Sequence, residues 1–92
     1  MKLEELYNII KDRQNKMPEG SYTASLFSEG EDRIIQKVGE EAIETVIAAK
    51  GNKKQCLISE LADLYFHLLV LMAKKEIKLE EIFDELEKRH KK

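Results

Sequence analysis

The chain has 92 residues, a formal net charge of −2 and a single cysteine, Cys56. This length predicts one small domain over residues 1–92. On folding, a chain this short buries only about 60–65% of the surface that it exposes when unfolded. Without a basic excess, a general role in binding nucleic acid or a membrane surface is not expected. A lone cysteine forms no intramolecular disulfide, which fits a cytoplasmic protein.

Apolar residues at helical spacing predict a first helix from the N-terminus to about Asn15. Pro18 and Gly20 follow, and residues of these two types end helices and shape turns. We expect a short helical turn after them, up to Phe27.

Ser21 or Thr23 is predicted to cap this short turn, and Gly30 to close it. A long helix is then predicted over 31–50, with acidic residues in its first turn and Lys50 in its last, as the helix dipole favours.

Gly51 and Asn52 separate this helix from the next one, which is predicted over 53–75 with Asn52 as its cap. A last amphipathic helix is predicted over 79–89. No stretch alternates as a strand does, so the predicted fold class is all-α: four main helices plus a short helical turn.

The predicted helix over 53–75 is unusually apolar. From Leu61 to Met72 every residue is apolar or aromatic except Asp63 and His67. A helix that is apolar nearly all round is buried nearly all round, and a domain of this size covers such a helix only with help. We therefore expect a homodimer in which a second copy completes the helical bundle.

Three polar residues of this helix, Glu60, Asp63 and His67, fall on one strip at 100° per residue. Buried carboxylates without partners cost several kcal/mol, so something must compensate Glu60 and Asp63. For His67 two interpretations stay open: it orients a carboxylate or phosphate, or it is a hydrogen-bonded core histidine.

The helix over 31–50 carries a matching acidic set, Glu40, Glu41 and Glu44, with Arg33 and Lys37 one to two turns earlier. Its core face is predicted to consist of Ile34, Ile35, Val38, Ala42, Val46 and Ala49. Taken alone, the acidic stretch is also typical of a solvated helical face.

Packed side by side, the two helices would gather Glu41, Glu44, Glu60 and Asp63 around one point. Divalent cations relieve such a concentration of negative charge, so the pattern predicts a site for Mg²⁺, or Mn²⁺, of the kind that serves phosphate chemistry. Lys37 and Arg33 would then reach phosphate oxygens that the metal leaves free.

With these residues the chain resembles the all-α nucleotide pyrophosphohydrolases, the MazG-like superfamily, and within it the phosphoribosyl-ATP pyrophosphatase family of histidine biosynthesis. The four acids alone indicate only the superfamily, and the similarity runs in collinear order over nearly the whole chain. Four strings carry it: Gly20-Ser21-Tyr22-Thr23, Lys37-Val38-Gly39-Glu40-Glu41-Ala42-x-Glu44, Glu60-Leu61-Ala62-Asp63 and Glu87-Lys88-Arg89-His90.

The resemblance implies Mg²⁺-dependent hydrolysis of phosphoribosyl-ATP to phosphoribosyl-AMP and pyrophosphate by a homodimer. It implies Glu41, Glu44, Glu60 and Asp63 as metal ligands and catalytic residues, and Glu40 as a further ligand or as the group that orients the attacking water. It also implies that Lys37 and Arg33 contact phosphates, and that Ser21, Tyr22 and Thr23 contact the nucleotide or its second phosphoribosyl group.

Two other functions are weighed against this one. A housecleaning enzyme of the MazG-like type would hydrolyse free nucleoside triphosphates with the same acids but another base pocket. A non-catalytic helical dimerisation module would leave the acids merely solvated, but Glu60 and Asp63 interrupt the most apolar helix, which argues against it.

Overall fold

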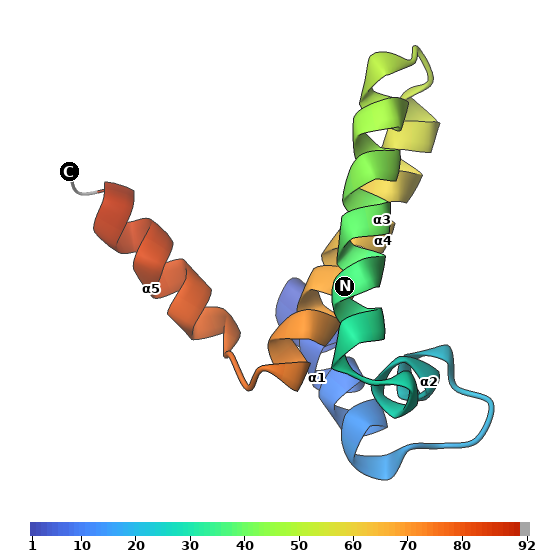
Figure 1. Cartoon of the computed structure of the whole chain (residues 1–92). Coiled ribbons are helices and arrows are strands. Elements are labelled where there is room, and N and C mark those ends of the chain that lie inside the picture. Colours follow the sequence, from blue (N-terminus) through green and yellow to red (C-terminus); the bar gives the residue numbers. More distant parts are fainter. Residues whose placement is uncertain (91–92) are drawn as a thin grey trace.

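The computed structural model describes residues 1–90, and within them it contains five α-helices and no strand (Figure 1). The helices are α1 (Leu3–Lys16), α2 (Tyr22–Glu29), α3 (Glu31–Lys50), α4 (Lys54–Lys74) and α5 (Leu79–His90). The all-α prediction is confirmed, and the short helical turn that was expected before Gly30 is a helix of eight residues, α2.

The two longest helices, α3 and α4, form an antiparallel hairpin and make the most extensive contact in the molecule (Figure 1). The predicted bounds of α3 are those observed, but the predicted cap of α4 is wrong. Lys53 occupies the N-cap position of α4, and no side chain caps this end. Asn52 lies in the tight connection one residue too early to reach the orphan amides of the first turn.

The small helix α2 is fixed at both ends by the residues that the sequence indicated. Ser21 is its N-cap, and the Ser21 hydroxyl accepts a hydrogen bond of 3.1 Å from the Ala24 amide. Gly30 links α2 to α3 at φ 105° and ψ 173°, a backbone conformation that residues with a side chain rarely adopt. This single residue is the whole connection between α2 and α3.

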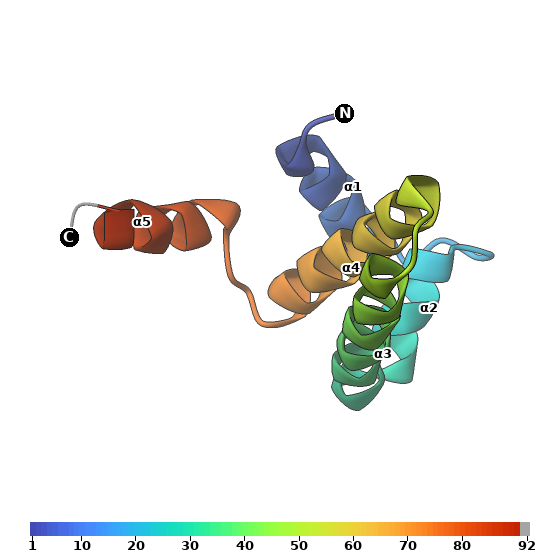
Figure 2. The same cartoon turned by 90° about the horizontal axis from the view of Figure 1, so that it is seen from above.

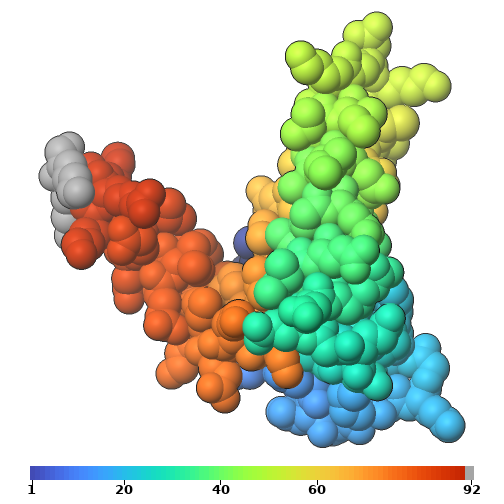
Figure 3. Space-filling model, viewed as in Figure 1, coloured from blue at the N-terminus to red at the C-terminus, as the bar shows by residue number. Residues whose placement is uncertain are grey.

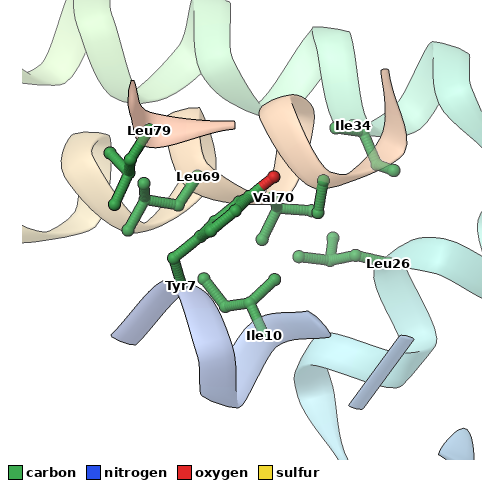
Figure 4. Packing of buried hydrophobic residues seen from close by; sticks show 8 residues of the cluster. Tyr7, Ile10, Leu26, Ile34, Leu69, Val70 and Leu79 are labelled. Atoms are coloured by element: carbon green, nitrogen blue, oxygen red, sulfur yellow. The ribbon is translucent and has the colours of Figure 1, made fainter. Parts of the chain in front are cut away.

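The hydrophobic core lies at the base of the hairpin, where the start of α3 and the end of α4 meet the other helices (Figure 4). Its members come from all five helices: Tyr7, Ile10, Leu26, Ile34, Leu69, Val70, Ala73 and Leu79. Tyr7 also donates a hydrogen bond from its hydroxyl to the carbonyl of Ile77, which ties α1 to the segment that leads into α5.

The outer half of the hairpin is little covered within one chain, and the predicted core face of α3 is less buried than expected. In the expected core face of α3, Ile34 is buried, but Ile35 and Val46 are 46% and 60% exposed and Ala49 is exposed as well. On α4, Leu61 and Tyr65 are exposed too. The reason is geometric: α1 and α2 pack at the base, and the hairpin extends beyond them (Figures 1 and 2).

The last helix, α5, projects from the body as an arm, and the space-filling view shows a hollow between this arm and the hairpin (Figures 2 and 3). Only its first residue, Leu79, is buried among the described residues of this helix. Its apolar side chains Ile82, Phe83 and Leu86 are 41–56% exposed.

By length and composition, α4 is apolar enough to cross a membrane. The core helix of a soluble protein meets the same criterion, so a single helix of this kind is weak evidence. Moreover α4 packs against α3 and α1, and Glu60, Asp63 and His67 interrupt its apolar surface.

Candidate active site

Carboxylates from the two helices of the hairpin meet between them. Glu41 of α3 and Glu60 and Asp63 of α4 each place one carboxylate oxygen within 4.8 Å of the others. Their exposure is graded: Glu41 is buried, Glu60 is partly buried and Asp63 is exposed. The group is therefore open to solvent on the Asp63 side and closed on the Glu41 side.

Two carboxylate oxygens of this group lack hydrogen-bond partners. Glu41 Oε2 and Glu60 Oε2 are both buried without a donor. Buried acceptors of this kind are costly unless a proton or a cation satisfies them. Three carboxylates around one point, with two orphaned oxygens, form the hard oxygen donor set that Mg²⁺ and Mn²⁺ prefer. The residues present thus fit a divalent cation.

Protonation equilibria in the group reflect the crowded negative charge. Hydrogen bonding with Glu44, then burial and the charges of Glu44 and Asp63, raise the pKa of Glu41 from 4.5 to about 7. The pKa of Glu60 is also raised, first by burial and then by the charges of Glu44 and Asp63. Glu44, although outside the set within 4.8 Å, therefore lies close enough to Glu41 and Glu60 to act with them.

The fifth predicted acid, Glu40, faces cations instead of the carboxylate group. Its carboxylate accepts a hydrogen bond of 2.8 Å from Gln36 and lies 3.4 Å from Lys37 Nζ and 3.7 Å from Arg33 Nη1. Burial works to raise the pKa of Glu40, but the hydrogen bonds from Lys37 and Gln36 outweigh it, and the pKa is lowered overall.

Arg33 and Lys37 form a cationic strip beside Glu40. Lys37 links this cationic strip to the acidic group. Its Nζ lies 3.4 Å from Glu40 Oε1 and 3.9 Å from Glu41 Oε1, and its side chain is only 17% exposed. Burial works to lower the pKa of Lys37, but the hydrogen bond with Glu40 and the charges of Tyr22, Glu41 and Glu40 raise it overall. Lys37 is thus held as a cation at the edge of the carboxylates.

Sequence reasoning missed Thr45, which joins the two helices at the site. Its hydroxyl lies 2.8 Å from the Glu41 carbonyl oxygen on its own helix and 3.3 Å from the Glu60 carbonyl oxygen on α4. The first contact follows from the i, i+4 spacing and was readable from the sequence. The second depends on how α3 and α4 align, which the sequence does not state.

The predicted substrate-contacting residues of α2 lie at its N-terminal end. Ser21 is used as the helix cap, Thr23 is half-buried in the first turn, and Tyr22 is 54% exposed. The Tyr22 hydroxyl lies 3.1 Å from Nε2 of His67, which is buried on α4. Of the two interpretations of His67, the structure shows the hydrogen-bonded one, with Tyr22 as an unforeseen partner.

Comparison with known proteins fits this arrangement. The sequence pattern of the family described as phosphoribosyl-ATP pyrophosphohydrolase matches residues 3–90. The chain belongs to this family. Proteins named phosphoribosyl-ATP pyrophosphatase are 52% identical in Clostridium novyi (98% of this chain, 82% of the relative), 49% in Saccharolobus solfataricus (97% and 95%) and 54% in Leptospira biflexa (98% and 95%).

Membership of the phosphoribosyl-ATP pyrophosphohydrolase family confirms the resemblance that the acidic strings indicated. The match begins and ends with the helical part of the chain, so α5 belongs to it as well as the carboxylate-bearing hairpin. Pyrophosphohydrolase chemistry in this family suggests a divalent metal, and the carboxylates of α3 and α4 are the group in the described residues that suits one.

Proposed function

We propose that the chain hydrolyses phosphoribosyl-ATP, with water, to phosphoribosyl-AMP and pyrophosphate, the second step of histidine biosynthesis, in the cytosol and as a single domain. The observation that carries the proposal is the meeting of Glu41, Glu60 and Asp63 in a chain of this family, with two buried oxygens left without partners.

In this proposal Glu41, Glu44, Glu60 and Asp63 hold Mg²⁺, or Mn²⁺. When bound, the ion supplies positive charge against the leaving pyrophosphate and lowers the pKa of water near it. The chain itself contributes the geometry: Thr45 fixes the carbonyls of Glu41 and Glu60 relative to each other, so the carboxylates of two helices stay at one point. Loss of the proton on Glu41, whose pKa is about 7, readies the site for a cation at neutral pH.

The cationic strip is suited to the phosphates. Lys37 and Arg33 both lie beside Glu40 and one or two turns before the carboxylate group, so a polyphosphate that reaches the acids through a metal passes these two cations. The lowered pKa of Glu40 keeps it ionised. In that state it accepts a hydrogen bond from the attacking water, or serves as a further metal ligand. Ser21, Tyr22 and Thr23 border the nucleotide end.

The experiment that tests the function measures pyrophosphate released from phosphoribosyl-ATP with Mg²⁺, with Mn²⁺ and with EDTA. We expect turnover with either metal and none with EDTA. Parallel reactions with dCTP and dUTP address the housecleaning alternative, which predicts faster turnover of these nucleotides than of phosphoribosyl-ATP. Neither substrate class being hydrolysed would leave the dimerisation module as the better explanation.

We also propose that the enzyme is a homodimer, because apolar side chains gather where nothing in the described chain covers them. The exposed apolar side chains on α3, α4 and α5 are Ile35, Ile43, Val46, Ile47, Ile58, Leu61, Tyr65, Leu68, Ile82, Phe83 and Leu86. Two almost wholly apolar grooves near the base of α5 share Leu68, Met72 and Ile82 in their walls. Apolar surface of this extent marks an interface more often than a free surface.

Light scattering on the purified chain tests the dimer, with an expected mass twice the 10.7 kDa of one chain. Leu68 and Ile9 are each 40% exposed, but only Leu68 lines the grooves. We expect Leu68→Glu to give a monomer and Ile9→Glu to leave the dimer intact. A monomeric wild-type chain would contradict the proposal.

A further inference from the structure

The contact between Tyr22 and His67 joins the end of α2 to the middle of α4, and the proposed chemistry leaves it without a role. The Tyr22 oxygen lies 3.1 Å from His67 Nε2, and His67 Nδ1 lies 2.7 Å from the backbone carbonyl oxygen of Asp63. One buried imidazole therefore connects a residue at the substrate end of the site with the turn of α4 that carries a proposed metal ligand.

The direction of these hydrogen bonds follows from the acceptor at one end. A carbonyl oxygen only accepts, so Nδ1 of His67 must carry the proton and donate to Asp63. In the neutral ring Nε2 then has a lone pair and no hydrogen. The Tyr22 hydroxyl must therefore donate to Nε2, and its only proton is used inside the protein.

Packing holds the Tyr22 ring in this position although the residue is 54% exposed. Its ring stacks on Phe66 at a centroid distance of 6.2 Å, and it meets the His67 ring edge-on at 6.1 Å. Phe66 in turn meets His67 edge-on at 5.0 Å. The three rings form one cluster, with His67 buried behind and Tyr22 facing the solvent.

The side chain of Tyr22 also lies near the cationic strip, since Tyr22 and Lys37 interact electrostatically. A ligand at this edge thus meets one hydrogen-bond donor and one hydrogen-bond acceptor. Lys37 offers protons only, which suits phosphate oxygens. Tyr22, with its proton committed to His67, offers lone pairs only, which suits a hydroxyl or an N–H group of the ligand and not an ionised phosphate.

We propose that His67 is a positioning residue that makes Tyr22 an obligate hydrogen-bond acceptor, so that Tyr22 recognises a ribose hydroxyl or an N–H group of the substrate while Lys37 takes the phosphates. The inference rests on the proposed function for the identity of the substrate. The hydrogen bonds themselves do not depend on it.

The first test needs no substrate. The chain has only two histidines, His67 and His90, so nitrogen NMR of the imidazoles at pH 8 resolves both. We expect His67 to be protonated at Nδ1 alone, and Tyr22→Phe to shift His67 Nε2 and leave His90 unchanged. A proton on Nε2, or no response to Tyr22→Phe, would overturn the inference whether or not the chain hydrolyses phosphoribosyl-ATP.

The second test asks whether the pair acts in binding. Loss of one hydrogen bond predicts that Tyr22→Phe and His67→Leu each raise KM for phosphoribosyl-ATP about fivefold, with kcat changed less than about twofold. Because His67 acts through Tyr22, the double variant should be no worse than either single variant. Additive losses would show that His67 supports only the fold and would refute the proposal.

If His67→Leu folds poorly, a third variant separates the role of His67 as a hydrogen-bond acceptor for Tyr22 from its role in supporting the fold. The amide oxygen of Gln can take the place of Nε2 as an acceptor, so His67→Gln should keep KM within about twofold of the wild type. A fivefold rise in KM for His67→Gln, in a variant whose melting temperature matches the wild type, would contradict the role of the acceptor.

Discussion

A proton and a metal ion should compete for the carboxylate of Glu41, and this competition predicts how metal affinity changes with pH. Without a metal the pKa of Glu41 is about 7, because of its hydrogen bond with Glu44, its own burial and the charges of Glu44 and Asp63. At pH 6 the side chain is then about 90% protonated and at pH 8 about 10%. If the ion needs the ionised carboxylate, binding of Mn²⁺ should release about 0.9 protons at pH 6 and about 0.1 at pH 8, and its affinity should rise about tenfold between them.

Titration calorimetry with Mn²⁺, in pairs of buffers that differ in ionisation enthalpy, counts these protons directly. Glu41→Gln should remove most of the pH-dependent release and weaken binding, and Glu60, whose pKa is also raised, accounts for any release that remains. Glu4→Gln changes an exposed acid in the first turn of α1 and should behave as the wild type. Equal affinity at pH 6 and pH 8, or release below about 0.2 protons at pH 6, would refute the assignment of Glu41 as a ligand that ionises on binding.

Without a metal, the raised pKa of Glu41 should also make the stability of the folded chain fall as the pH rises. The pKa of Glu41 in the folded chain lies above the 4.5 of the unfolded one, so the native state binds the extra proton between these values. Its contribution is full below about pH 4.5 and is lost as the pH rises through 7. Thermal melts in EDTA should therefore give a lower melting temperature at pH 8 than at pH 6, and saturating Mn²⁺ should reduce the difference. A higher melting temperature at pH 8 in EDTA would contradict the sign.

Substitutions at Gly30, Thr45 and Lys37, each with a matched control, probe other parts of the structure. Gly30 has φ 105° with nothing within 4 Å of an added Cβ, whereas Gly39 has equal space within α3. In urea unfolding, Gly30→Ala should be destabilised by about 1–3 kcal/mol and Gly39→Ala stabilised by about 0.5–1 kcal/mol. Equal effects of the two substitutions would exclude backbone strain at Gly30. Thr45→Val should cost about 1 kcal/mol and weaken Mn²⁺ binding, with Thr45→Ser restoring both; unchanged Mn²⁺ affinity would mean that the hydroxyl does not set the site. Lys37→Gln should lower kcat/KM about 30-fold, while Lys50→Gln, at the far end of α3, should change it little; equal losses would show a general charge effect.

The helices themselves were largely readable from the sequence, because local chemistry decides them. Gly30 closes α2 and opens α3 by its backbone alone, and Ser21 caps α2 by a hydroxyl three residues from its partner. Asn52 shows the limit of such rules, since a capping residue type sits in the loop but the turn starts the helix one residue too late for it.

Contacts between helices were predicted only where a strong physical demand singled them out. Glu60 and Asp63 had to be compensated in an apolar helix, so their meeting with Glu41 was expected. The second contact of Thr45 and the pairing of Tyr22 with His67 depend on the register of packed helices, which residue types do not specify.

The most direct measurement of the central claim is the rate of pyrophosphate release from phosphoribosyl-ATP by Glu60→Gln beside the wild type, at saturating Mg²⁺. Glu60 contributes an orphaned buried oxygen to the carboxylate group, and Gln keeps its size while removing its charge. The account predicts a loss of at least about 100-fold in a variant that still folds. A rate within about threefold of the wild type would show that hydrolysis does not depend on the carboxylates between α3 and α4.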